Sequence, residues 1–276
     1  MPMLLALASV YSLDGTGTAL TALFIAYCLK IKEKDNANKK ELSILLVLLI
    51  LAASIKSVGY IGISLIVFIL PLKKIIKQNK KYIKYILPLL LIILLAVVSI
   101  YKTNINSSGD ERAPGSNTKA QFEYVLNNPV QYCKVLANNT IDTFLNFRAM
   151  SYLNAPMFFS TTYYIVFLGI ALYLMVISLM DSSKQFKITN RLVFIITFFI
   201  VYVMTTTAMY LSYTKVGANY IKGDQMRYIF PIMFLILISI STNKLEIKNN
   251  LKYSNLYIAY PMAIFLIISV LDVVII

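Results

Sequence analysis

Long apolar runs without charge alternate with short, lysine-rich turns along this chain. A membrane span needs about 20 mostly apolar residues to cross about 30 Å of hydrocarbon, and several runs reach or approach that length. The pattern predicts spans at 16–29, 42–55, 57–72, 85–101, 162–180, 193–211, 228–241 and 257–276. We therefore expect an all-α fold, a polytopic transmembrane bundle of about eight or nine helices that forms a single domain over residues 1–276.

Residues 1–11 are also apolar but too short to span. They fit a signal-peptide core, an interfacial segment or the tail of a helix that begins earlier. A signal peptide opens with a basic region, and Met1-Pro2-Met3 has no charged side chain. We therefore favour the helix tail.

The apolar stretch 42–72 decides the direction of every later span. As one helix it would extend for about 46 Å and would bury Lys56 near mid-membrane, which costs about 2.5–3.5 kcal/mol. As a short helical hairpin it has two arms of about 21 and 24 Å, with Lys56-Ser57-Val58-Gly59 at the tip. The hairpin also keeps the lysine clusters of 30–41 and 73–84 on one side of the membrane, so we predict the hairpin.

The basic residues then orient the bundle. Most of the 26 Lys and Arg residues fall in the loops 30–41, 73–84, 181–192 and 242–256, which the positive-inside rule assigns to the cytoplasm. The segments 102–161 and 212–227 are therefore extracytoplasmic loops. The net charge of +14 arises from these turns, so a nucleic-acid partner is not expected.

Composition narrows the possible chemistry. The chain is 59% hydrophobic and only 14% charged, where a soluble domain carries about 25% charged residues. It contains no histidine, which excludes histidine zinc sites and a Ser-His-Asp triad. Cys28 and Cys133 fall on opposite sides of the predicted membrane and should not pair.

The long loop 102–161 has two parts. Residues 103–118 are rich in Asn, Ser, Gly and Pro and are expected to be flexible. Asn128-Pro129 resembles an N-cap followed by proline at the first helical position, and predicts an amphipathic helix over about 129–147. Its apolar positions recur at helical spacing, namely Val130, Cys133, Ala137, Ile141, Phe144 and Leu145. The helix fits a position on the outer membrane surface, a roof over a cavity, or a packed cap without a ligand.

The second loop, 212–227, gathers polar groups beside the start of the next span: Lys215, Lys222, Asp224, Gln225 and Arg227. Arginine at this place binds phosphate, or extends to the interface beside a tyrosine. Asp14 either caps the helix that follows it or contacts a substrate. Lys56 is either a solvated hairpin tip or a phosphate ligand.

Four motifs occur in one order along the chain: Ser12-x-Asp14, Lys56 at the hairpin tip, Asn128-Pro129, and Gly223-x-Gln225-x-Arg227-Tyr228-x-x-Pro231. Together they resemble the bacterial multi-pass family catalogued as domain of unknown function 2142, which is similar to the GT-C class of membrane glycosyltransferases. Family members usually have further helices and an acidic extracytoplasmic loop before the matching segment. The chain therefore resembles the C-terminal part of such a protein, without the loop that usually supplies the catalytic base.

The resemblance implies a GT-C-like glycosyltransferase in the bacterial cell membrane. Its donor would be a polyprenyl-phosphate-linked sugar and its acceptor a cell-surface glycan or a lipid-linked molecule. Arg227, Lys56 and Lys222 would bind the phosphate. Gln225 and Tyr228 complete the substrate-binding motif.

The carboxylates have less specific expected roles. Asp224 and Asp14 would contact sugar hydroxyls, or a divalent metal ion if one is used, and no metal-binding residues are assigned. Asp14 is the candidate within this chain for deprotonating the acceptor. One alternative is a transporter or flippase-associated subunit for a lipid-linked or anionic solute, with a polar path around Thr205, Thr206, Thr207 and Tyr210. A structural subunit without a ligand is the third interpretation.

Overall fold

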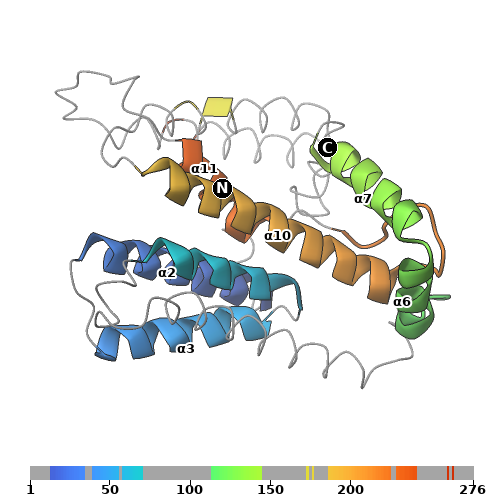
Figure 1. The fold of residues 1–276 in the computed structure, drawn as a ribbon, viewed down its shortest axis with the longest axis horizontal. Helices are drawn as coiled ribbons and strands as arrows, with labels where there is room; N and C mark the ends of the chain where they lie inside the picture. The colour runs from blue at the N-terminus through green and yellow to red at the C-terminus, as the bar shows by residue number, and fades with distance from the viewer. Residues whose placement is uncertain are drawn as a thin grey trace.

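The computed structural model is helical throughout the part of the chain that it describes (Figure 1). That part comprises residues 13–34, 39–55, 58–70, 113–144, 186–224 and 228–240, with the single positions 172, 173, 176, 260 and 263. Within these residues the only β-structure is one isolated antiparallel β-bridge, between Ser116 and Lys215. The all-α prediction is therefore confirmed for the described residues.

Helix α10 (Ile188–Tyr213) is the longest described helix and contacts most of the other elements. It has 26 residues, an 18-residue stretch within it has a mean hydropathy of 2.2, and within the described ranges it is the one helix long and apolar enough to cross a membrane. It covers the predicted span 193–211. The predicted spans 85–101, 162–180 and 257–276 lie outside the described residues, apart from isolated positions, as does the segment 1–11. The multi-pass bundle therefore stays a prediction.

Two further helices lie where apolar runs predict them. Helix α2 (Leu13–Glu33) covers the predicted span 16–29, and α3 (Lys39–Ile55) covers 42–55. The two helices pack side by side (Figure 1). Their buried side chains join those of α10 in one apolar core, which includes Phe24, Leu49 and Phe194.

The second arm of the predicted hairpin is a 3₁₀ helix, η1 (Val58–Ile69), and not an α-helix. Three residues per turn align positions three apart on one face. The side chains that share this face are all buried: Tyr60, Ile63, Ile66 and Ile69. A rise of about 2.0 Å per residue also makes the 12 residues of η1 extend for about 24 Å, where an α-helix would reach about 18 Å.

The two arms of the predicted hairpin are separate elements. Helix α3 ends at Ile55, η1 begins at Val58, and the two pack against each other. Lys56, the predicted tip, lies outside the described residues.

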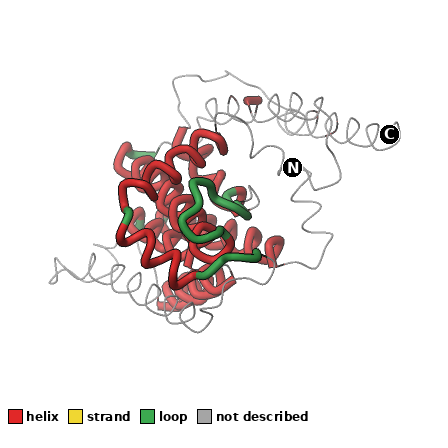
Figure 2. Tube along the Cα trace, turned by 90° about the vertical axis from the view of Figure 1, so that its right-hand side faces the viewer, coloured by secondary structure: helices red, strands yellow, loops and turns green. Residues whose placement is uncertain are grey.

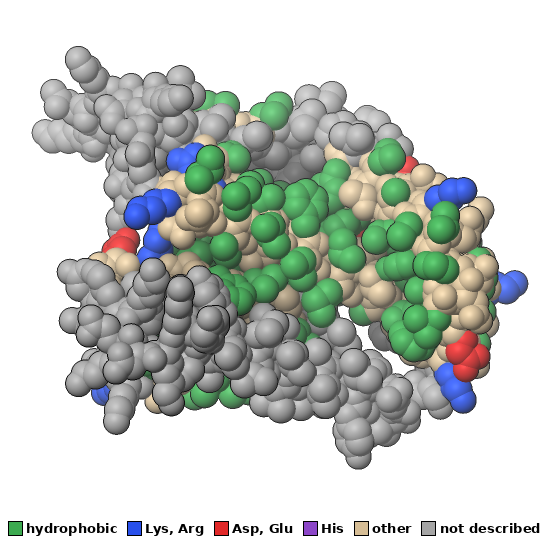
Figure 3. All heavy atoms as spheres, viewed as in Figure 1, with side chains coloured by type: hydrophobic (Ala, Val, Ile, Leu, Met, Phe, Trp, Pro, Cys, Tyr) green, Lys and Arg blue, Asp and Glu red, His purple; other side chains and the backbone are tan. Residues whose placement is uncertain are grey.

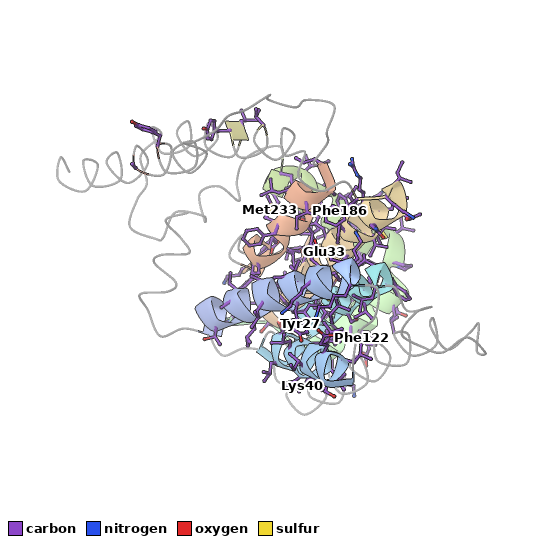
Figure 4. The ribbon with its side chains drawn as sticks, turned by 90° about the vertical axis from the view of Figure 1, so that its left-hand side faces the viewer. Tyr27, Glu33, Lys40, Phe122, Phe186 and Met233 are labelled. Atoms are coloured by element: carbon purple, nitrogen blue, oxygen red, sulfur yellow. The ribbon has the colours of Figure 1, made fainter. Side chains whose placement is uncertain are left out.

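The basic ends of three helices meet at one end of the structure. Lys34, just after α2, pairs with Glu41 in the first turn of α3, and this hydrogen-bonded carboxylate raises the pKa of Lys34. Lys32 of α2 lies 3.8 Å from the ring centroid of Phe186, just before α10. Arg191 Nε of α10 donates to the Phe186 carbonyl over 3.0 Å. Figure 4 looks onto this end, which we call the basic end, and shows Glu33 and Phe186 close to one another.

The opposite end is covered by a helical pair and a loop. Helix α6 (Thr118–Asn127) leads into α7 (Pro129–Phe144), and residues 214–224 follow the end of α10. The loop and α6 are tied together by the Ser116–Lys215 bridge and by Gly217 N, which donates to Gln121 Oε1 over 2.8 Å. We call this the capped end. Figure 2 views it directly, with the loop in green in front of the helices.

Helix α6 was not predicted. The composition of residues 103–118 predicts a flexible segment, and within the loop 102–161 no element is predicted before Asn128. Asn117 caps the helix, because its Oδ1 accepts from Ala120 N over 3.0 Å. Gln121, which points toward the loop, is fully buried.

The predicted span 228–241 begins with a short 3₁₀ turn, η3 (Phe230–Ile232), and continues as α11 (Met233–Ile240). Pro231 lies in this first turn, where its missing N–H removes no helical hydrogen bond. Leu235 and Ile232 are buried in the core shared with α2 and α10. Met233, at the start of α11, packs at the edge of that core (Figure 4).

Candidate functional site at the capped end

Helix α7 runs antiparallel to α10 along the half of α10 nearest the capped end. Tyr132, near the start of α7, hydrogen bonds to Thr207, and its ring lies 5.3 Å from that of Tyr210. Phe144, at the end of α7, lies 5.2 Å from the ring of Tyr202. The two helices therefore stay adjacent over about three turns, joined by large side chains.

Asp224 is the described carboxylate at the centre of this end. Its Oδ2 accepts from Asn139 Nδ2 of α7 over 2.8 Å and from Thr206 Oγ1 of α10 over 3.3 Å. Asp224 is half-buried and Thr206 is fully buried. The Asp224 carboxylate thus links α7 to α10. Asp224 also directly precedes Gln225, where the Gln225-x-Arg227 motif begins.

Further hydroxyls line the same junction. Tyr202 OH donates to Thr140 Oγ1 over 3.2 Å, and Thr140 Oγ1 donates to the Leu136 carbonyl over 2.7 Å. Burial raises the pKa of the Tyr132 phenol, so this hydroxyl stays protonated at neutral pH. The α7–α10 junction therefore gathers several hydroxyl groups near the Asp224 carboxylate.

Two glycines shape the loop that carries Asp224. Gly223 has a φ of 83°, and a Cβ there would lie 2.6 Å from Cδ1 of Tyr213. Gly217 has a φ of 72° and packs against the ring of Tyr124. Glycine adopts positive φ without steric cost and allows this close approach. Gly223 in the motif thus sets the backbone path directly before Asp224.

Lys222 does not join the Asp224 cluster. Its side chain is exposed and its Nζ lies 6.0 Å from the ring centroid of Tyr213, while its backbone N–H donates to Thr214 Oγ1 over 3.0 Å. Lys222 is therefore placed as a cation on the outer surface of the loop.

Tyr228 links the motif to the second hairpin arm. Its carbonyl accepts a hydrogen bond from the hydroxyl of Tyr60, a buried residue of η1. The start of η1 and the start of the final described span therefore lie together.

The other predicted site residues are not described in full. Lys56, Gln225 and Arg227 lie outside the described residues. Asp14 lies in the first turn of α2, and the structure does not describe its side chain. The structure thus brings Asp224 together with Asn139 and Thr206, and tests none of the assigned roles.

The described residues do not fit a divalent metal site. Within them there is no group of three or more His, Cys, Asp or Glu side chains. The groups nearest the Asp224 carboxylate are the Asn139 amide N–H and the Thr206 hydroxyl, which are hydrogen-bond donors toward it. This arrangement suits a carboxylate that is held by hydrogen-bond donors.

Sequence reasoning missed Asn139 and the role of the threonine run. Thr205, Thr206 and Thr207 were noted as a polar path for the transporter alternative. In the structure the Thr206 hydroxyl donates to Asp224, and Thr207 pairs with Tyr132. The signal available in the sequence was the run of three polar residues Asn138-Asn139-Thr140 within the predicted amphipathic helix.

The family resemblance is confirmed by comparison with known families. The model of the family DUF2142, described as a predicted membrane protein, matches residues 1–236. No curated protein and no solved structure matches the chain. The matched region covers most of the chain and includes α10 and the motif from Gly223 to Pro231. On this evidence, the chain belongs to the DUF2142 family of predicted membrane proteins.

Proposed function

We propose that this membrane protein is a GT-C-like glycosyltransferase, or the C-terminal part of one, in the bacterial cell membrane. It uses a polyprenyl-phosphate-linked sugar and acts on a cell-surface glycan or lipid-linked acceptor at the extracytoplasmic face. In this proposal the capped end is extracytoplasmic and the basic end is cytoplasmic, as the positive-inside rule requires.

The observation that carries the proposal is the position of Asp224. Asn139 and Thr206 hold its carboxylate from two different helices. The loop that ends at Asp224 leads directly into the motif of Gln225 and Arg227. Asp224 is therefore a positioning residue: it fixes the point at which the proposed phosphate-binding segment leaves the cap.

The hydrogen bond between Tyr60 and Tyr228 supports a shared phosphate site. Arg227 immediately precedes Tyr228, and Lys56 precedes Tyr60 by four residues in the sequence. Their described neighbours are hydrogen bonded to one another. A lipid-linked phosphate requires cations near the membrane surface, and arginine binds phosphate through paired N–H groups.

The transporter alternative has less support. A transporter needs a polar route through the bundle. Instead, Thr206 donates its hydroxyl to Asp224, Tyr210 donates to the Ala218 carbonyl, and the Thr207 hydroxyl pairs with that of Tyr132. These three side chains attach the cap to α10.

The decisive experiment is donor binding by the Arg227→Ala variant. The full chain is reconstituted in vesicles, and a photoactivatable polyprenyl-phosphate hexose is used as the probe. Loss of charge-assisted hydrogen bonds of about 1.5–3 kcal/mol should weaken binding by roughly tenfold to a hundredfold. Binding that equals that of the unaltered chain would remove Arg227 from the site.

Arg191→Ala and Lys215→Ala are controls that test whether donor binding depends on the location of the lost positive charge. Arg191→Ala removes an arginine at the basic end, and it should leave donor binding intact. Lys222→Ala and Lys215→Ala each remove an exposed lysine from the loop of residues 214–224. Only the Lys222 variant should weaken binding, and equal effects of the two would indicate a general surface attraction for anions.

A further inference from the structure

Helix α7 packs Val135 and Leu136 inward against α10 and the loop of residues 214–224, and it exposes a separate apolar stripe. Tyr132, Asn139 and Thr140 point their polar groups toward α10 and the loop that ends at Asp224. The outward positions are exposed: Val130, Cys133, Ala137 and Ile141. Val130 exposes 69% of its surface and Ile141 48%.

The outward stripe is a continuous feature of the helix. Its four positions are three or four residues apart, so they align along one face. A second exposed edge holds the polar residues Gln131, Lys134 and Asn138. A helix on a water-soluble protein turns its apolar stripe toward the core and its polar face outward. Helix α7 instead has apolar residues on two sides, because Val135 and Leu136 pack inward while the stripe stays exposed among the described residues.

The position of α7 beside α10 indicates which medium this is. The contacts run from Tyr132 at Thr207 to Phe144 at Phe198. Twelve residues of helix extend for about 18 Å, which compares with about 15 Å for half of the hydrocarbon thickness. Helix α7 therefore accompanies α10 through the depth of one leaflet.

The same half of the structure exposes further apolar residues. Helix α10 exposes Phe199 and Val203, and α6 exposes Phe122 and Leu126. On the face shown in Figure 3, hydrophobic side chains gather over α10 and continue toward α6 and α7. The stripe on α7 thus extends the apolar surface of the helix that is long enough to cross the membrane.

We propose that α7 is inserted beside α10 in the leaflet nearest the capped end, where its stripe of Val130, Cys133, Ala137 and Ile141 contacts lipid acyl chains. The helical backbone satisfies its own hydrogen bonds, and Tyr132, Asn139 and Thr140 are bonded to α10 and to Asp224. Gln131, Lys134 and Asn138 form a polar edge beside the stripe, which faces away from the acyl chains. This inference depends on membership of a membrane-protein family and not on glycosyl transfer.

The native cysteines allow a test without engineering. Cys133 lies exposed on the stripe, whereas Cys28 is fully buried in α2. A nitroxide label attached to the unaltered chain should therefore mark Cys133, and Cys133→Ser should remove the labelling. The labelled protein is reconstituted in vesicles of phosphatidylethanolamine and phosphatidylglycerol. Collision of the label with dissolved oxygen and with a water-soluble nickel chelate is then measured.

Lipid contact predicts frequent collision with oxygen and rare collision with the nickel chelate. The oxygen-to-nickel ratio should be several-fold higher at Cys133 than at Lys134→Cys on the Cys133→Ser background, because Lys134 lies on the polar edge. Ile141→Cys should give a higher ratio than Val130→Cys, since Ile141 lies farther along α7 from the cap.

Two results would overturn the proposal. Frequent collision with nickel at Cys133 would place the stripe in water. Rare collision with both reagents would show that protein covers the stripe, and dipolar coupling between labels would then identify a second copy of the chain. Neither result alters the prediction for donor binding by Arg227→Ala, so the two proposals fail independently.

Discussion

Helix α10 holds two neighbours in different ways. The 3₁₀ helix η1 packs against it closely through apolar surface: a Cβ at Gly62 would lie 3.0 Å from Cγ2 of both Ile200 and Val201. Helix α7 stands off from α10 on large side chains and meets it through hydroxyl pairs, such as Tyr132 with Thr207, while its Asn139 amide bonds to Asp224 in the loop after α10. One contact depends on close fit and the other on polar pairs.

This difference follows from the solvent. Between helices in a bilayer, apolar burial gives little net attraction, because lipid tails are as apolar as leucine. Close approach at a small residue and hydrogen bonds across the contact remain as the stabilising interactions. Gly62 supplies the first for η1, and Asn139 with Tyr132 supplies the second for α7. The predictions below disturb each contact separately.

Gly62→Val should have the largest effect on stability. Overpacking a close contact costs about 1–3 kcal/mol, and the added methyl groups meet Ile200 and Val201. We expect a lower thermal midpoint in detergent and faster amide hydrogen exchange in η1, with exchange in α7 unchanged. Gly62→Ala adds a smaller group and should destabilise less.

A compensating variant tests this contact. Val201→Ala combined with Gly62→Ala removes the opposing methyl groups and should recover part of the loss. Equal thermal midpoints for Gly62→Val and the unaltered chain would mean that η1 does not depend on close approach to α10.

Asn139→Ala should have the next largest effect, and it should act on α7. The variant removes the amide that donates to the Asp224 carboxylate over 2.8 Å. Hydrogen bonds between helices in membranes average about 0.6 kcal/mol and reach about 1.7 kcal/mol, and the charge on Asp224 favours the upper part of this range.

The adjacent Asn138 is exposed and provides the matched control. Amide exchange in α7 and in the loop of residues 214–224 should rise in Asn139→Ala and stay unchanged in Asn138→Ala. A similar rise in both variants would show that the Asp224 contact does not hold α7.

The same contrast explains what the sequence could predict. Helices α2, α3 and α10 were predicted because each contains an uninterrupted apolar run, and such a run indicates a helix that crosses the membrane. Helix α6 was missed because it is short and mixes charged Lys119 and Glu123 with apolar residues. The 3₁₀ form of η1 was also missed, since an apolar run has no residues that distinguish three from 3.6 residues per turn.

The site was predictable only in part. Asp224 was identified because polar groups crowd the start of a span. Its partner Asn139 lies 85 residues away in sequence, and neither composition nor periodicity reports such a pairing. Of the predicted stripe on α7, Val130, Cys133, Ala137 and Ile141 are exposed together, whereas Phe144 packs inward against Tyr202 and Leu145 lies outside the described residues. Hydrophobicity alone does not say which side of the helix an apolar residue faces. The hydrogen bonds of the opposite side settle the direction of the stripe in the structure.

The smallest expected effect belongs to Tyr132 and Thr207, and a double-mutant cycle measures it. Tyr132→Phe removes one hydroxyl and keeps the ring against Tyr210, and Thr207→Val removes the other. Each single variant should cost about 0.6 kcal/mol, the average for such bonds in membranes. The double variant should cost little more than either alone, because both remove the same bond. Strict additivity would mean that the two hydroxyls act separately, and α7 would then be held by ring packing, as η1 is held by fit.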